Sequence, residues 1–228
     1  MTGRKPLVVA IDGPSGVGKS TAARMLARRL GVPFLDTGAM YRAVALAVLE
    51  SGADPADPRA VAPLGERADI RLEPRGDGTF EVLLDGRPVE ERIRSREVSE
   101  AASKVSEHPG VRRRMVALQR AIAGRQGGVL EGRDIGTRVF PDTPHKFFLD
   151  ARPEVRFRRR HDQLEAAGRG EEYGTVVEEI TARDERDSRR ADSPLTRDPS
   201  YTFIDTSDLP LEEVVEAMAR QIERGSEP

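Results

Sequence analysis

The 228-residue sequence contains no cysteine, so it has no disulfide framework and no thiolate metal site. A chain of this length can bury a core without such cross-links, as one large domain or two small ones. No apolar run approaches 18 residues, and residues 1–6 lack the apolar segment of a secretion signal. We therefore expect a cytoplasmic protein with no membrane contact.

Lysine is also scarce, because only four of the 37 basic residues are lysines and the other 33 are arginines. The planar guanidinium group binds phosphate and carboxylate groups through two hydrogen bonds, which suits a phosphate-handling protein. A GC-rich genome produces the same bias, so only arginines beside other motif residues are informative. The net charge of −2 gives no indication of a nucleic acid polymer as a partner.

Short apolar runs alternate with helical stretches along the chain. Strands are expected at 7–11, 32–35, 128–131, 146–150 and 201–205, and helices at 20–30, 95–122 and 211–222. This alternation predicts an α/β fold with a five-stranded, doubly wound parallel sheet.

The stretch between the second and third of these strands is too long for a single crossover. Residues 68–72 and 79–84 alternate in polarity, and turn residues lie at 76–78 and 85–86. They predict a small antiparallel β insertion at about 67–92. The Pro- and Asp-rich residues 54–63 are interpreted as a connector.

The strongest motif is Gly13-x4-Gly18-Lys19-Ser20, which lies between a predicted strand and a predicted helix. Backbone N–H groups of such a P-loop surround phosphate oxygens at the start of the helix. Lys19 is expected to reach the β- and γ-phosphates of ATP, and Ser20 to bind Mg²⁺. The predicted ATP-binding residues are Gly13, Pro14, Ser15, Gly16, Val17, Gly18, Lys19, Ser20 and Thr21.

A P-loop alone fits GTPases, motor ATPases and small-molecule kinases. A GTPase needs an Asn-Lys-x-Asp segment, which this sequence lacks, and long ATPases usually have a strand that ends in an Asp or Asp-Glu pair for Mg²⁺. Here the third predicted strand leads instead into Arg133 and Asp134, at the edge of the sheet where ligands bind. The pattern favours a small-molecule kinase.

Three further segments carry candidate ligand-binding residues. Asp36 follows the second strand, and Tyr41 and Arg42 follow in the next helix. Residues 183–190 place two arginines and an aspartate on one helical face, which also fits an exposed, salt-bridged helix. The arginine-rich residues 152–160, followed by turn glycines, fit either a lid that closes over phosphates or a basic exposed helix.

Together these segments resemble the bacterial cytidylate kinases, of the nucleoside monophosphate kinase family, over nearly the whole chain. The resemblance lies in residues 11–16, 35–42, 99–106, 131–141 and 183–187. Its most specific part is the Arg-Asp-Ile-Gly-Thr-x-Val-Phe-Pro stretch. Thr37 stands where serine is common and Ser20 where glycine is also seen, and both residues keep or add a hydroxyl.

The resemblance implies a single P-loop kinase domain and a monomer. The core would comprise about 1–36, 128–151 and 171–228, the nucleoside-monophosphate-binding region about 37–127, and a helical lid about 152–170. The implied reaction is phosphoryl transfer from ATP to CMP, and to dCMP, with Mg²⁺ and no nucleic acid polymer as partner. Since the acceptor phosphate is mostly dianionic at pH 7, no catalytic histidine is expected among His108, His145 and His161.

The resemblance also implies roles for single residues. The cytosine or its surroundings would be contacted by Thr37, Ser103, Arg112 and Asp187, the ribose by Arg183 and Asp187, and the acceptor phosphate by Arg42, Arg133 and Arg190. Tyr41 is a further substrate-binding candidate. The catalytic candidates are Lys19, Arg133, Asp134, Arg156, Arg159 and Arg160. Asp36 and Asp134 would orient Mg²⁺-bound water and neighbouring arginines.

Two alternatives remain open. The first is another small-acceptor P-loop kinase, for UMP, shikimate or dephospho-coenzyme A. The second is a nucleotide-dependent switch with slow ATP turnover, against which the missing Asn-Lys-x-Asp segment argues.

Overall fold

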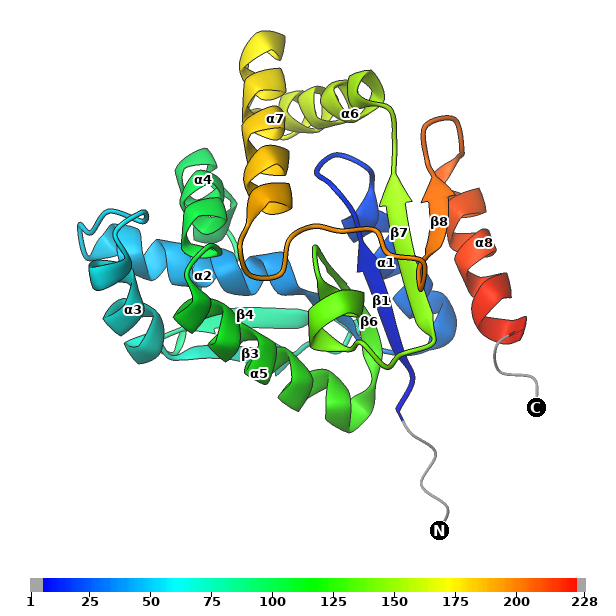
Figure 1. Cartoon of the computed structure of the whole chain (residues 1–228), viewed down its shortest axis with the longest axis horizontal. Coiled ribbons are helices and arrows are strands. Elements are labelled where there is room, and N and C mark those ends of the chain that lie inside the picture. Colours follow the sequence, from blue (N-terminus) through cyan, green and yellow to red (C-terminus); the bar gives the residue numbers. More distant parts are fainter. Residues whose placement is uncertain (1–5, 225–228) are drawn as a thin grey trace.

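The computed structural model describes residues 6–224 and contains the predicted five-stranded parallel sheet. Its strands lie in the order β2-β6-β1-β7-β8 (Figure 1). They are β1 (Val8–Asp12), β2 (Phe34–Asp36), β6 (Gly128–Gly132), β7 (His145–Asp150) and β8 (Thr202–Asp205). The predicted doubly wound α/β fold is confirmed, and each strand lies within two residues of its expected position.

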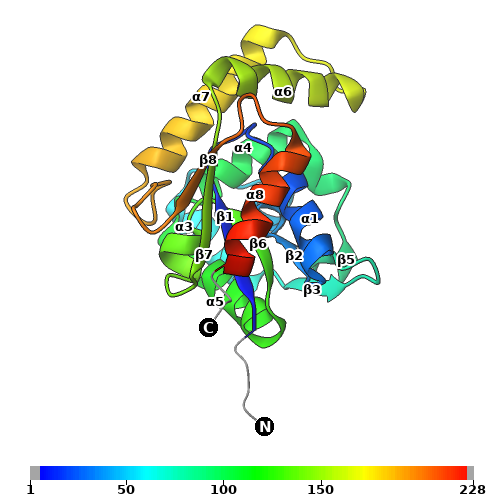
Figure 2. The same cartoon turned by 90° about the vertical axis from the view of Figure 1, so that its right-hand side faces the viewer.

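Helices cover both faces of this sheet, so its central strands are apolar on both sides. Val9 and Ile11 of β1 face α1 (Lys19–Leu30) and α8 (Leu211–Arg224), which also contact each other (Figure 2). Ala10 faces the opposite side, where α5 (Pro109–Gln126) and the π-helical turn η2 (Ile135–Val139) pack. The alternation of side chains along β1 thus divides the core between two helical layers.

A second core lies beside the sheet, within residues 37–126. It joins α2 (Thr37–Glu50), α3 (Pro58–Arg67), α4 (Arg96–Val105) and part of α5 to a small antiparallel sheet. That sheet contains β3 (Ile70–Pro74), β4 (Phe80–Leu84) and β5 (Arg87–Pro88). The predicted β insertion is therefore present, with a short third strand that the sequence pattern did not indicate.

Two local predictions were wrong. Residues 54–63 are only in part a connector, because α3 begins at Pro58, with Asp57 accepting a hydrogen bond from the backbone N–H of Arg59. Proline is well suited to the first position of a helix, and aspartate to the cap before it. The expected helix at 95–122 is two helices, since α4 ends at Val105 and the residue before Pro109 is biased away from helical geometry.

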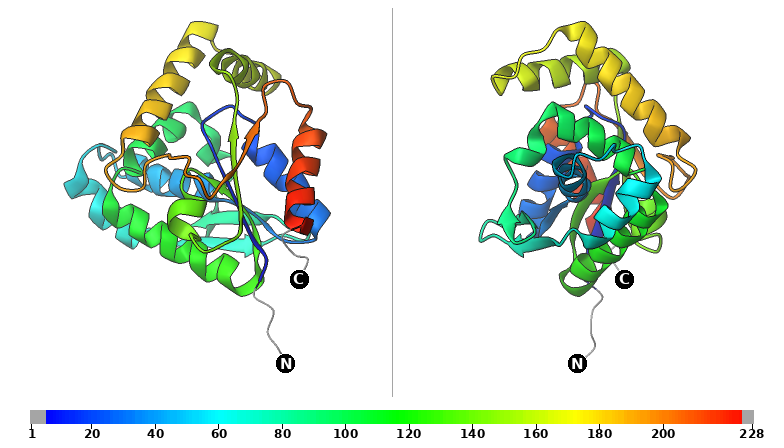
Figure 3. Two further views of the ribbon diagram at one scale, coloured as in Figure 1. Left: turned by 45° about the vertical axis from the view of Figure 1, so that its right-hand side comes forward. Right: turned by 90° about the vertical axis from the view of Figure 1, so that its left-hand side faces the viewer.

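The helices α6 (Pro153–Ala166) and α7 (Tyr173–Arg189) lie above the carboxyl end of the sheet (Figure 3). They pack on each other through Leu164, Val176 and Ile180. A short 3₁₀ turn, η1 (Arg92–Arg94), precedes α4, which contacts α7. Within residues 6–224, none of the helices is long and apolar enough to cross a membrane.

Candidate active site

The P-loop joins β1 to α1, and its backbone passes very close to other main-chain segments. Gly13 (φ +146°) leaves no room for a side chain, since a Cβ there would lie 2.0 Å from the Leu149 carbonyl oxygen. Gly18 (φ +91°) caps α1 without a side-chain hydrogen bond. The first N–H groups of α1 therefore remain available to an anion, as phosphate binding requires.

Lys19 is buried at the first position of α1, and its ammonium group donates to the Pro14 carbonyl. Burial and the nearby Arg133 guanidinium lower the pKa of Lys19 to about 7. A bound phosphate would offset this penalty, because it brings negative charge to a buried cation. The position of Lys19 is thus suited to an anionic ligand.

Two carboxylates lie beside the P-loop at the ends of adjacent strands. Asp36 of β2 is in register with Glu131 of β6, and the side chain of Ser20 lies beside Glu131. Burial and the neighbouring Asp36 carboxylate raise the pKa of Glu131. Two crowded carboxylates and a hydroxyl form a set of oxygen donors that suits Mg²⁺.

Glu131 had no role in the prediction from sequence, although it ends a predicted strand next to Arg133. Asp134, which was expected to orient Mg²⁺-bound water and neighbouring arginines, is buried and pairs with Arg112. Of these two acidic residues, Glu131 is therefore the better candidate for the metal site.

Arg133 links the P-loop to α7. Its Nε donates to Asp187 Oδ2 at 2.8 Å, and its Nη2 donates to Ser15 Oγ at 2.9 Å. Asp187 is buried, and Arg190, just beyond the end of α7, lies 3.2 Å from its Oδ1. Although burial opposes ionisation, Arg133, Arg183 and Arg190 together lower the pKa of Asp187. This face of α7 is a buried charge cluster rather than an exposed, salt-bridged surface.

The remaining predicted acceptor residues surround this cluster. Thr37 donates to the Glu131 carbonyl at 2.6 Å, and Arg42 pairs with Asp36 at 2.8 Å. Arg112, almost fully buried, faces the ring of Tyr41 at 5.8 Å.

Two hydrogen bonds connect the C-terminal part of α4 and the residue after it to the C-terminal part of α7 and the residue after it. Arg186 Nε donates to Ser103 Oγ at 3.0 Å, and Arg190 Nη1 donates to Ser106 Oγ at 3.3 Å. Arg186 had not been selected from the sequence, because an exposed position and an inward position look alike in an arginine-rich helix.

The three predicted lid arginines of α6 have different surroundings. Arg156 donates to the Ser15 carbonyl and pairs with Asp184, whose other oxygen accepts from the Ser15 N–H at 3.1 Å. Arg160 lines a cavity together with Ser15 and Arg183. Arg159 instead donates to the Thr206 hydroxyl and carbonyl, which ties α6 to the segment after β8. Arg156 and Arg160 therefore lie toward the P-loop, and Arg159 anchors the helix.

Several arginines have a buried Nε atom with unused hydrogen-bonding capacity. Within residues 6–224, the buried Nε atoms without a hydrogen-bond partner include those of Arg42, Arg112, Arg156, Arg183 and Arg190. Buried donors are normally satisfied, so a group of unsatisfied ones indicates where a ligand with many acceptor atoms binds. All five side chains belong to the predicted site.

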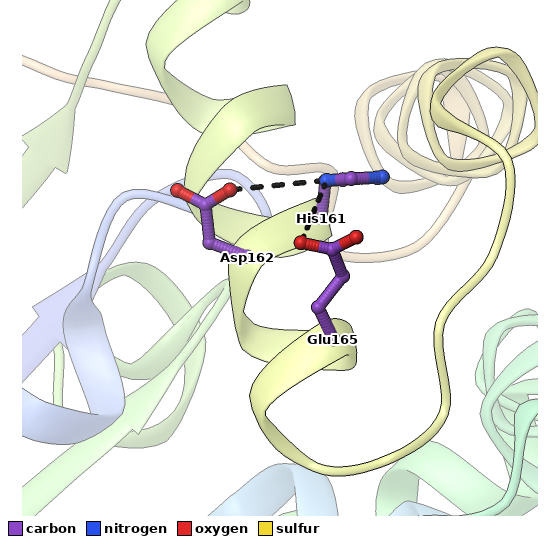
Figure 4. Close-up of side chains that lie close together, drawn as sticks. All are labelled: His161, Asp162 and Glu165. Atoms are coloured by element: carbon purple, nitrogen blue, oxygen red, sulfur yellow. Dashed lines mark ion pairs between the residues drawn. The ribbon is translucent and has the colours of Figure 1, made fainter.

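One further group of potential metal ligands lies on α6, formed by His161, Asp162 and Glu165 (Figure 4). Its carboxylates are largely exposed, and their distances to His161 Nδ1 are 3.8 and 3.9 Å. Such contacts are typical of a solvated helical surface, and we assign the group no role.

Residues 9–224 match the cytidylate kinase family. The chain belongs to this family. A cytidylate kinase of Pelotomaculum thermopropionicum is 46% identical over 217 residues, covering 95% of this chain and 96% of the relative. That of Corynebacterium glutamicum is 48% identical over 223 residues, covering 97% and 96%.

The cytidylate kinase family is the one that the sequence motifs resemble, so that prediction is confirmed. Among solved structures, an uncharacterised protein from Eubacterium ventriosum matches 96% of this chain and 99% of its own, with a TM-score of 0.54 at 16% identity. This likeness concerns the fold alone.

Proposed function

We propose that this cytidylate kinase family member transfers the γ-phosphoryl group of ATP to CMP, and to dCMP, giving ADP and CDP or dCDP. The observation that carries the proposal is the position of Arg133, which bonds to Ser15 in the P-loop and to Asp187 on α7. One side chain thus connects the loop that holds the donor to the cluster assigned to the acceptor. Family membership supports CMP as that acceptor.

The donor would be held by residues 13–21, with the N–H groups at the start of α1 and the Lys19 ammonium group around the phosphates. Mg²⁺ would be held by Ser20 and, through its bound water, by Asp36 and Glu131. When bound, it neutralises charge on the donor phosphates. Glu131 replaces Asp134 in this assignment because Glu131 lies in register with Asp36, whereas Asp134 pairs with the buried Arg112.

Four of the five arginines with an unsatisfied Nε, all except Arg156, are assigned to the acceptor. Arg42, Arg133 and Arg190 would bind the phosphate. Arg42 pairs with Asp36, and Arg133 and Arg190 pair with Asp187. Arg183 and Asp187 would hold the ribose. Thr37, Ser103 and Arg112 would surround the base together with Asp187, with the Tyr41 ring packed against Arg112.

The chemistry needs no general base, because the acceptor phosphate is mostly dianionic at pH 7. The chief barrier is bringing two anions together away from water. Correct positioning can contribute about 7–11 kcal/mol, and fixed cations stabilise the developing charge. Lys19, Arg133, Arg156 and Arg160 would serve this purpose, whereas Arg159 would hold α6 in place.

We further propose that residues 152–170 act as a lid, that residues 37–127 bind the acceptor nucleotide, and that the remaining described residues form the core. A monomer acting in the cytoplasm, where ATP and CMP are present, is the simplest form of this enzyme.

Direct detection of products tests the proposal. Purified protein with ATP, CMP and Mg²⁺ should form CDP and ADP in equal amounts, as separated by anion-exchange chromatography. ADP formed without CDP, at the same rate with and without CMP, would contradict the assignment and favour a slow nucleotide switch.

A further inference from the structure

Asp12 is a fully buried carboxylate at the end of β1, directly before the P-loop, and has no role in the mechanism above. Its Oδ1 accepts the backbone N–H of Ile135 at 2.9 Å. Its Oδ2 accepts the backbone N–H of Gly136 at 2.8 Å and the hydroxyl of Tyr201 at 2.7 Å. One side chain thus receives three hydrogen bonds from two distant parts of the chain.

The first two of these bonds begin where the strand pairing of β1 and β6 ends. The last residues in register are Asp12 and Gly132, so the main-chain ladder does not hold the residues that follow. Those residues are Arg133 and Asp134, and then Ile135 and Gly136 at the start of η2. The Asp12 carboxylate therefore fixes the far end of the turn that carries Arg133 and Asp134.

The third bond connects the same carboxylate to the segment between α7 and β8. Tyr201 is almost fully buried and packs edge-on against Phe148. A Cβ at Gly136 would lie 2.7 Å from the Tyr201 hydroxyl oxygen, so the turn and the tyrosine are closely fitted around Asp12. This packing leaves little freedom for the turn to move.

The charge of Asp12 suits this arrangement. Burial raises the pKa of Asp12 to about 6. The hydrogen bonds from Gly136, Ile135 and Tyr201 lower this pKa, and the nearby Asp134 carboxylate raises it. The group is mostly a carboxylate at pH 7, and two carboxylate oxygens can accept all three donors. An asparagine of the same size has only one such oxygen.

We propose that Asp12 is a positioning residue, which holds Arg133 and Asp134 at a fixed place relative to the P-loop. It acts through the turn and touches neither nucleotide. Because Arg133 bonds to Ser15 and Asp187, a displaced turn would alter the distance between donor and acceptor. The inference rests on the proposed transfer from ATP to CMP.

The test compares Asp12→Asn with the wild-type protein, which is assayed alongside for CDP formation. In the variant, the amide NH₂ group must face either the Ile135 N–H or the Gly136 N–H, which weakens the hold on the turn. We expect kcat to fall by about 100-fold, as for a misplacement near 1 Å, and KM for CMP to rise several-fold. The Kd of ATP, measured by calorimetry without CMP, should change by less than about threefold because the P-loop is unaltered.

Asp198→Asn is the matched control, because Asp198 accepts hydrogen bonds from the backbone and hydroxyl of Ser200 in the same segment as Tyr201. It should leave kcat and both substrate affinities unchanged. Tyr201→Phe removes one of the three donors, and we expect it to lower kcat about fivefold with the same sparing of ATP binding. This variant decides the question if Asp12→Asn does not fold.

Unchanged kcat and KM for CMP in folded Asp12→Asn would overturn the inference, and so would equal losses of ATP and CMP affinity. If Asp12→Asn does not fold, unchanged kinetics in Tyr201→Phe would overturn it. Failure of the wild-type protein to form CDP would refute the proposed function itself, so the two failures are distinguishable.

Discussion

At the scale of single residues, the site consists of charges buried beside one another. Lys19, Glu131 and Asp187 are all buried, and each contacts or faces a group of the opposite sign. Burying a charge is costly unless a partner or ligand compensates it. Such a cluster is therefore better explained by ligand binding than by stability.

The first prediction concerns Lys19. Lys19→Ala should lower kcat by at least about 10²–10³-fold, since it removes a fixed cation from the transferring phosphoryl group. The melting temperature should not fall, because burial lowers the pKa of Lys19 to about 7 and the folded protein therefore disfavours its charged form. Lys104→Ala, on α4, is the matched control, and steady-state assays of both proteins check the prediction. Near-normal turnover in Lys19→Ala would remove this residue from the mechanism.

The second prediction concerns the pH dependence of stability at Asp187. The pKa of this carboxyl is lower in the folded protein than its ordinary value of 3.8. Its contribution to stability is therefore complete above pH 3.8 and is lost as the pH falls through the folded-state pKa. At pH 7, Asp187→Asn should cost about 3 kcal/mol, because it leaves buried arginine charges without their partner.

Urea unfolding of both proteins between pH 3 and pH 7 measures this difference. It should be largest near neutral pH and should narrow as the solution becomes acidic. Asp208→Asn, at an exposed carboxylate that pairs with Arg152, should show little change. A difference for Asp187→Asn that grows on acidification would contradict the assignment.

At the scale of helices and strands, the P-loop and α6 are in direct contact at Gly16. This residue has φ +81°, and a Cβ there would lie 2.7 Å from the Arg156 carbonyl oxygen. Gly31, at the end of α1, has φ +64° but no atom within 4 Å of the same position. A comparison of substitutions at these two glycines therefore separates the effect of backbone strain from the effect of contact with α6.

The third prediction uses this pair. Gly16→Ala should displace α6 or the loop and raise KM for ATP by about tenfold or more, through both strain and overlap. Gly31→Ala should cost only the strain of a left-handed residue, about 1 kcal/mol, and leave KM for ATP unchanged. Kinetic assays and melting curves of both variants check this. Equal effects of the two substitutions on KM would refute a role for the contact with α6.

The elements that the sequence identified are those with strong local signals. The apolar runs of the five strands predicted the sheet, and the glycines predicted the tight turn between β1 and α1. The start of α3 was missed because proline and aspartate favour both turns and helix beginnings. The break before Pro109 was missed because helical periodicity continues on both sides of it.

At the scale of the whole molecule, the site depends on contacts between residues far apart in the sequence. Ser15, Arg133 and Asp187 lie on three separate elements, yet they form one hydrogen-bonded chain. The P-loop motif selected Ser15 and the resemblance selected Arg133 and Asp187, but neither could show which partners these residues contact. Strand register, which placed Glu131 beside Asp36, and the bonds of Asp12 were not visible in local patterns.

The fourth prediction is also the most direct test of the account, because the identity of the acceptor is its central claim. We would measure kcat/KM for CMP, dCMP, UMP and AMP at saturating ATP and Mg²⁺, following ADP release. CMP and dCMP should be the best acceptors, with CMP at least about tenfold better than UMP and AMP. A larger kcat/KM for UMP or AMP than for CMP, or ADP release that no acceptor increases, would contradict the account.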